Sequence, residues 1–218
     1  MAVTEYAKAV LPEVIGCPRF LVNREIVNAI IKFCKDTNFY EIGFEYDVED
    51  TDVDDTDNYS VTIDYTTELS NNEIIAMHVT EFRIDGALFE TQYLRLNDNQ
   101  TYLDDLRLNS AIFFHFSSAT EVKFFGLQEV DQTFYVKMAY YPVNTITTFD
   151  SDIYNFGHEA IEALAKSVLM SMPDKAWTNL QMAAANLQEY NGKMGYAKIL
   201  KSKGFTQGDS RVESVRFF

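Results

Sequence analysis

The chain is poor in cysteine: its 218 residues contain only Cys17 and Cys34. Two thiols are too few for the disulfide framework of a small secreted domain, so we expect both to be free and buried in a reducing compartment. No general base accompanies Cys34 in a recognisable motif, which favours a small core residue over a nucleophile. The sequence also lacks a run of 18 apolar residues and a basic amino-terminal region followed by an apolar one. We therefore expect neither a membrane span nor a signal peptide.

Basic side chains are scarce as well. The chain has 18 Lys and Arg against 33 Asp and Glu, a formal charge of −15. Such an excess opposes non-specific binding to a phosphate backbone, so the sequence does not predict a protein that grips nucleic acid. With 47% hydrophobic and 23% charged residues, the composition is that of an ordinary folded protein of one large or two small domains.

The motifs of common enzyme classes are absent from the sequence. There is no glycine-rich phosphate loop, no Gly-x-Ser-x-Gly elbow, no Cys-x-x-Cys pair and no His-Glu-x-x-His. The three histidines, His78, His115 and His158, are scattered, and His158 followed by Glu159 is simplest as a solvated pair. We expect no enzyme, no cofactor and no catalytic or metal-binding residue.

One acidic segment, residues 45–57, leaves two interpretations open. Its like charges repel, which favours an extended, solvated loop. The alternative is an irregular cation site, because Asp50, Asp52 and Asp54 have the first three spacings of an EF-hand loop. However, Asp55 stands where that loop needs glycine, and Val61 stands where it needs its bidentate glutamate.

Apolar residues at helical spacing occur at both ends of the chain. They predict helices at 4–11, at 23–37 with Asn23 as the N-cap, at 150–173, and from Lys175 to Gly204. The last would have about 28 residues and a length of about 42 Å.

The middle of the chain changes to alternation with a period of two, which is typical of half-buried strands. The expected strands are 40–48 and 59–65, a hairpin over 74–89 that turns at Asp85-Gly86, and 111–117, 121–127 and 133–141, the last two joined by a turn at 130–132. A short helical crossing is expected at 101–108. The sequence thus predicts an α+β fold in which the terminal helices pack together and an antiparallel β lobe is inserted between them. The expected division is a helical domain of 1–38 with 150–204, a β lobe of 39–149, and an extended tail of 205–218.

The last predicted helix has apolar residues on more than one side. Trp177, Leu180, Ala184, Leu187 and Met194 fall near one face, and Met182, Ala185, Tyr190 and Ala197 fall near another. A helix packed only within its own domain needs a single apolar stripe, so the second face predicts a subunit interface. We assign Leu187 and Tyr190 to it, whichever of the two points outward.

After Gly204 the helical spacing stops, and an apolar tail follows. Fully burying each phenylalanine side chain is worth roughly 1.5–3 kcal/mol, so the tail should dock, either on this chain or on another. The residues expected to dock are Arg211, Val212, Val215, Arg216, Phe217 and Phe218.

Several strings give the chain a resemblance to the head-to-tail adaptor (connector) proteins of tailed bacteriophages, in the family's order and over nearly the full length. They are Val-Leu-Pro-Glu-Val-Ile-Gly-Cys-Pro at 10–18, Phe-Cys-Lys-Asp-Thr at 33–37, Leu-Asp-Asp-Leu at 103–106, Val-Lys-Met-Ala-Tyr-Tyr-Pro at 136–142, Met-Pro-Asp-Lys-Ala-Trp at 172–177 and Arg-Phe-Phe at 216–218. None of these strings is a chemical signature. This chain also has Ala163-Leu164-Ala165 where the family often carries glycine.

The resemblance implies a virion structural protein, assembled in the host cytoplasm, that forms a ring of twelve copies in the neck. Such a ring joins the capsid portal to neck or tail proteins and provides a channel through which DNA passes as cargo. Its carboxyl-terminal tail would dock on the portal protein, and no membrane is involved. The alternatives are another tail, baseplate or fibre structural protein, and an uncharacterised hydrolase.

Overall fold

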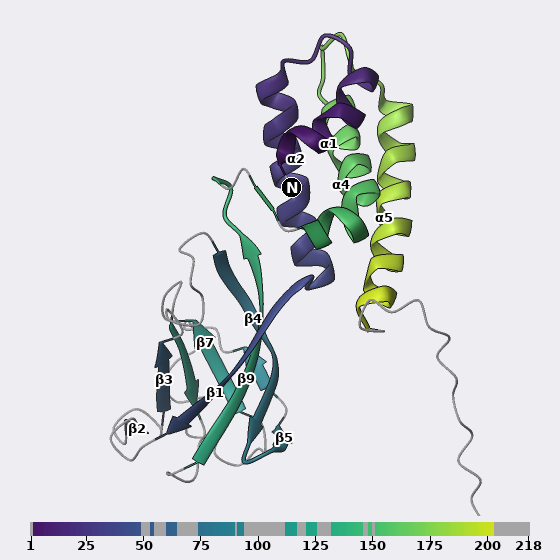
Figure 1. The fold of residues 1–218 in the computed structure, drawn as a ribbon. Coiled ribbons are helices and arrows are strands. Elements are labelled where there is room, and N and C mark those ends of the chain that lie inside the picture. Colours follow the sequence, from purple (N-terminus) through teal and green to yellow (C-terminus); the bar gives the residue numbers. More distant parts are fainter. Residues whose placement is uncertain are drawn as a thin grey trace, which may run out of the picture. The chain divides into compact units, whose positions relative to one another are not determined.

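The computed structural model describes residues 2–48, 53–54, 60–64, 74–89, 91–93, 112–116, 121–125, 132–145, 148–149 and 151–202. The chain divides into two compact units, residues 1–39 with 146–218 and residues 40–145 (Figure 1). We call the first the helical unit and the second the β unit. Their boundaries differ from the expected ones by one residue at 38/39 and by four at 149/145. The mixed α+β class that the sequence predicts is confirmed.

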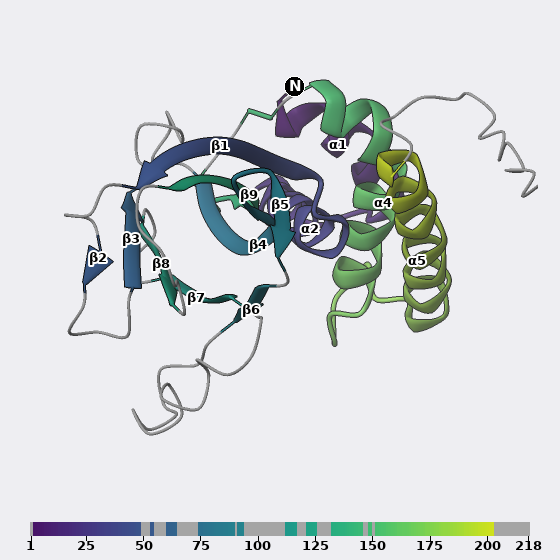
Figure 2. The ribbon, with the colours of Figure 1, turned by 90° about the horizontal axis from the view of Figure 1, so that it is seen from below.

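The helical unit is built around one central helix. It contains α1 (Val3–Val10), the 3₁₀ turn η1 (Leu11–Glu13), α2 (Arg19–Thr37), α4 (Ser151–Met170) and α5 (Leu180–Ser202). Helix α4 contacts α1, α2 and α5, and Figures 1 and 2 both show it between α2 and α5. Its buried residues lie around most of the helix circumference: Ile153, Gly157, Ala160, Ile161, Ala163, Leu164, Ala165, Ser167, Leu169 and Met170. Segments from both ends of the chain therefore cover α4.

Helix α2 begins earlier than the sequence predicted. Pro18, with φ −60° and ψ 133°, precedes its first residue, so Asn23 lies inside the helix and is not its N-cap. Proline has a fixed φ suited to this position and loses no needed hydrogen bond there, which explains the earlier start. At the other end Asn38 adopts a left-handed conformation, φ 51°, and the helix stops there as predicted.

Helix α5 begins later than predicted, at Leu180 and not near Lys175. The Lys175 amide donates to the Thr178 hydroxyl oxygen at 3.0 Å, and that hydroxyl donates to the Met172 carbonyl at 2.5 Å. Asn179 then caps the helix, because its side-chain oxygen accepts from the Met182 amide at 3.1 Å. The segment 171–179, including Trp177, is thus a closed connector, and α5 has 23 residues and a length of about 34 Å.

The β unit contains two sheets. One has the order β1-β9-β4-β5, from Tyr40–Val48, Gln132–Pro142, Ile74–Ile84 and Ala87–Phe89. The other has the order β2-β3-β8-β7-β6, from Val53–Asp54, Ser60–Asp64, Glu121–Phe125, Ile112–Phe116 and Thr91–Tyr93. Every pair in them is antiparallel except β6 with β7, which is parallel and departs from the fully antiparallel lobe that we predicted.

Aromatic side chains join the two sheets. The Phe82 ring on β4 lies 4.6 Å from the Phe124 ring on β8 and 5.2 Å from the Phe134 ring on β9, measured between centroids. All three are fully buried in a core that also takes residues from β1, β3 and β7. The hairpin turn at Asp85-Gly86 is confirmed: φ is 47° and 82° at these residues, as a tight hairpin turn requires.

Some predictions fall outside the described residues. These are the helical crossing at 101–108, residues 130 and 131 of the expected turn, most of the acidic segment 45–57 and the whole tail 205–218. Gln132, the last residue of that turn, is the first residue of β9. Asp50 and Asp52, two of the three ligands of the cation alternative, lie outside the described residues, and the side chain of the third, Asp54, is not described either.

Helices α4 and α2 approach each other closely at Gly157. A Cβ atom added to Gly157 on α4 would lie 2.7 Å from Cε1 of Phe33 on α2, a residue that is fully buried. Glycine therefore stands inside this helix, despite a cost of about 1 kcal/mol relative to alanine, because it lets the two helices meet.

We predict that Gly157→Ala lowers the free energy of unfolding by roughly 1–3 kcal/mol, because the methyl group forces Phe33 from its place. The matched control is Gly192→Ala on α5, where an added Cβ meets no atom within 4 Å. It should raise stability by about 1 kcal/mol through helix propensity. Urea unfolding gives the free energy of unfolding of both variants. A Gly157→Ala variant that is more stable than the unmodified chain would mean that the helices do not need this glycine.

Candidate subunit interface

One row of α5 faces its own unit. The row consists of Ala183, Asn186, Tyr190 and Ala197, all of them buried. The Tyr190 hydroxyl donates to Asp36 Oδ2 on α2 at 2.6 Å, and Lys32 Nζ lies 3.0 Å from the same oxygen. Burial raises the pKa of Tyr190, and the hydrogen bond to Asp36 raises it further. Tyr190 therefore ties α5 to α2 as a neutral phenol.

The two residues predicted for the interface have different places. Tyr190 is 1% exposed and enclosed by its own unit, so it is not available to a neighbouring copy and the prediction for this residue is corrected. Leu187 is 45% exposed and remains a candidate. The other large hydrophobic residues exposed on α5 are Leu180, Met182, Tyr196 and Ile199. Large apolar residues are thus exposed on more than one side of this helix, in addition to the row that faces its own unit.

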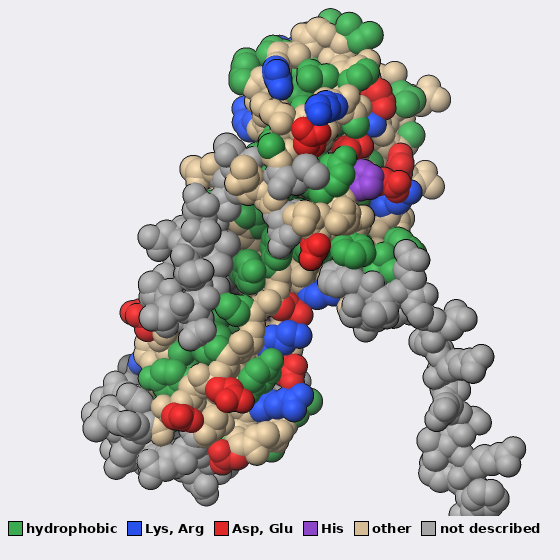
Figure 3. Space-filling model, in the orientation of Figure 1, with side chains coloured by type: hydrophobic (Ala, Val, Ile, Leu, Met, Phe, Trp, Pro, Cys, Tyr) green, Lys and Arg blue, Asp and Glu red, His purple; other side chains and the backbone are tan. Residues whose placement is uncertain are grey.

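The two connectors of the helical unit lie against each other. A Cβ built on Gly16, which has φ 86°, would lie 4.0 Å from the Ala176 Cβ, so residues 11–18 touch the connector between α4 and α5. Beside this contact Ile15 is 79% exposed and Phe20 is 73% exposed. Figure 3 shows hydrophobic side chains at the surface at this end of the helical unit. Sequence periodicity did not reveal this patch, because connector residues carry no periodic signal.

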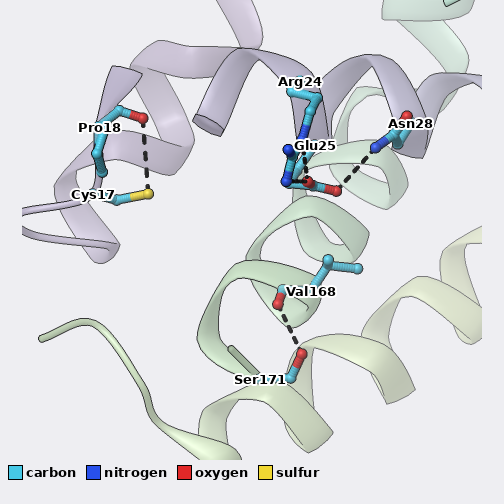
Figure 4. Close-up of polar contacts among 7 residues, drawn as sticks. All are labelled: Cys17, Pro18, Arg24, Glu25, Asn28, Val168 and Ser171. Atoms are coloured by element: carbon cyan, nitrogen blue, oxygen red, sulfur yellow. Dashed lines mark hydrogen bonds and ion pairs between the residues drawn. The ribbon is translucent and has the colours of Figure 1, made fainter. Parts of the chain in front are cut away.

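The two cysteines are free and buried. Burial raises the pKa of Cys34, and burial together with the charge of Glu25 raises the pKa of Cys17. Glu25 is itself buried, and both of its oxygens are satisfied from α2: Arg24 Nη2 lies 2.7 Å from Oε1, and Asn28 donates to Oε2 at 3.1 Å (Figure 4). These groups are structural.

His158 packs against Tyr154 of its own helix. His158 Nδ1 lies 2.7 Å from the Tyr154 carbonyl oxygen, and its ring stacks on that of Tyr154, with centroids 4.8 Å apart. Glu159 bonds to Lys193 of α5, which lowers the pKa of the Glu159 carboxyl group.

Within the described ranges, no three His, Cys, Asp or Glu residues stand where they could hold a metal ion. None of the helices described there is long and apolar enough to cross a bilayer.

Charge is divided unequally between the two units. The β unit, residues 40–145, contains 21 Asp and Glu against 5 Lys and Arg, a formal charge of −16. The rest of the chain contains 12 acidic and 13 basic residues, a formal charge of +1. On the described strands some of the acids are paired, as Glu41 is with Lys137 at 3.0 Å and Glu81 with Arg83 at 2.5 Å. The near-neutral helical unit is therefore the part of the chain that another copy can approach without strong repulsion.

Comparison with known proteins adds no relative. No protein-family model matches the chain, and no curated protein matches it. The surfaces and charges described above therefore carry the argument about function, together with the resemblance noted in the sequence.

We predict that Tyr190→Phe lowers the free energy of unfolding by roughly 1.5–3 kcal/mol, since a buried hydrogen bond to a charged group is lost. The variant should nevertheless self-associate like the unmodified chain at temperatures at which it is folded. Tyr190→Glu should prevent folding, because it places a second carboxylate beside Asp36 without a partner. Circular dichroism and sedimentation measure both effects, and a folded Tyr190→Glu chain that fails to associate would restore Tyr190 to the interface.

Proposed function

We propose that this protein is a head-to-tail adaptor of a tailed bacteriophage virion. In this proposal copies of the chain form a ring, dodecameric as in the family it resembles, between the capsid portal and the neck or tail proteins. The ring surrounds a channel for DNA, which is cargo and not a ligand. The chain performs no chemistry and works by holding its neighbours in place.

The observation that carries the proposal is the set of large hydrophobic residues exposed on α5, Leu187 among them. A helix that contacts only its own unit has no use for large exposed hydrophobic residues along its outer side. A ring of identical copies, by contrast, needs a surface that each copy offers to the next. The helical unit, with its small net charge, can supply that surface.

The positions of two of the sequence strings that carry the resemblance to adaptor proteins also support the proposal. Residues 10–18 and 172–177, which carry part of the resemblance, are far apart in the sequence but meet at Gly16 and Ala176. Several residues of these strings are exposed, among them Pro12, Ile15 and Pro173. Exposed residues shared with a family are better explained by a common partner than by a common core.

The charge of the β unit agrees with a passage for DNA. A wall of net negative charge does not retain a polyanion, and DNA that must leave the capsid quickly has to pass without being held. The cation alternative for residues 45–57 belongs to this same unit and would reduce its charge.

The proposed portal contact is the carboxyl-terminal tail, with Arg211, Val212, Val215, Arg216, Phe217 and Phe218. It lies outside the described residues, so its support is the sequence alone. Its arginines and apolar residues suit a partner surface that is acidic and apolar.

We predict that removing residues 210–218 abolishes binding to the portal protein and leaves the melting temperature within about 2 °C, since α5 ends at Ser202. Thermal unfolding and a pull-down with the purified portal protein test this side by side. A control variant, Ser210→Ala, should bind normally. Normal portal binding by the truncated chain would exclude the tail as the contact.

We also predict that Leu187→Glu prevents ring closure and leaves the monomer folded, because a carboxylate on the apolar flank of α5 has no partner in the interface. Electron microscopy of necks carrying the variant is the measurement, with Leu88→Glu as control, since Leu88 is exposed on the β unit. Normal necks with Leu187→Glu would show that this flank faces solvent. An elongated trimer of the unmodified chain would favour a fibre protein.

A further inference from the structure

Helix α5 has an outer row without charge. Ala185, Gln188, Gly192, Tyr196 and Ile199 follow each other at spacings of three and four residues, so they share one side, and all five are exposed. Tyr196 is 56% and Ile199 is 54% exposed. Three charged residues of α5, Lys193, Lys198 and Lys201, lie on other sides of the helix, and Glu189 stands at the edge of the row, four residues after Ala185 and three before Gly192. An exposed row with two large apolar residues and a single charge at its edge is suited to contact with protein.

Two glycines in this part of α5 have no role within the helical unit. A Cβ atom on Gly192 or Gly195 would meet nothing within 4 Å, in contrast to Gly157, where it would strike Phe33. Each glycine costs the helix about 1 kcal/mol relative to alanine. Because neither position carries a Cβ atom, a bulky side chain of a partner can approach the helix backbone beside the exposed Tyr196 and Ile199.

Bulky exposed side chains occur on a different surface of the same unit. Ile15 and Phe20 stand on either side of the start of α2, next to the contact between Gly16 and Ala176. Nearly three quarters or more of each side chain is exposed, and within the described residues nothing covers them. We call Ile15 and Phe20 the knobs of the helical unit.

The charge division indicates which partner fits. Two copies that meet through their β units bring together two charges of −16, whereas two helical units of charge +1 meet almost without repulsion. The outer row is uncharged and the knobs are apolar, so each surface is chemically suited to the other. The occupant that these observations favour is a second copy of this chain.

We propose that the knobs Ile15 and Phe20 of one copy pack on the outer row of α5 in the next copy, over Gly192 and between Tyr196 and Ile199. The contact joins two different surfaces, so each copy keeps one free knob pair and one free row, and repeated contacts close a ring. This inference deepens the proposed function and rests on its ring, but not on the portal, the tail or DNA.

Two variants remove one surface each without endangering the fold. Gly192→Leu fills the row and strengthens the helix, so the variant should unfold at a higher temperature than the unmodified chain. Phe20→Glu places a carboxylate in the first turn of α2, where the helix dipole favours it. Each variant alone should sediment at the 25.0 kDa of one chain at concentrations at which the unmodified chain associates. The control Leu88→Glu, on the β unit, should associate normally.

An equal mixture of the two variants gives the decisive result. Phe20→Glu retains an intact row and Gly192→Leu retains intact knobs, so the mixture should form a dimer of twice 25.0 kDa and nothing larger. A contact of the row with itself would let Phe20→Glu dimerise on its own, and a row that is covered by the tail of the same chain would give no dimer in the mixture. Either result overturns the proposal, as does an unmodified chain that stays monomeric up to about 1 mM.

The outcome is separable from that of the proposed function. Rings in the virion neck together with a mixture that does not dimerise would leave the adaptor in place and reject this contact. Dimerisation of the mixture together with virions that lack the protein would support the contact and reject the adaptor.

Discussion

The helical unit depends on the enclosure of α4. Buried residues lie around most of its circumference, so α4 is stable only when segments on several sides cover it. α1 and α2 come from one end of the chain and α5 comes from the other, which makes the unit discontinuous in sequence. Gly157 brings α2 close, and the bond from Tyr190 to Asp36 joins α5 to α2. Because the inner side of α5 packs within its own unit, only its outer side can contact a partner.

Most of the fold could be predicted from periodicity, and the errors have local causes. The change from a helical period to alternation at Tyr40 coincides with the first residue of β1, because burial on one side of an element leaves a regular pattern. The start of α5 was misplaced because Thr178 and Asn179 make side-chain bonds that close the chain into a connector, and such bonds leave no period. The parallel pairing of β6 with β7 could not be foreseen either, since strand direction depends on the path of the chain between strands.

The candidate interface was predictable only in part. The sequence indicated that α5 has two apolar sides, but it could not tell the inner side from the outer. An aromatic residue with a hydroxyl, such as Tyr190, suits a buried row as well as an exposed one. Leu187 and Tyr190 are three positions apart, and only the position of α4 determines which of the two side chains is buried and which is exposed. The knobs were missed because Ile15 belongs to a connector and Phe20 to the first turn of α2, which lies before the predicted helix start. The charge division required the unit boundaries before it could be counted.

The insertion of the β unit also sets an order of events during synthesis. Residues 40–145 are continuous and can fold as soon as they leave the ribosome, but α1 and α2 must wait until α4 and α5 have been made. At about 5–20 residues per second, the 106 residues of the β unit impose a delay of roughly 5 to 20 s. The outer row of α5 belongs to the last helix, so it exists only when the helical unit can close around α4. A nascent chain thus lacks the outer row, so two unfinished copies on one messenger cannot pair through this contact.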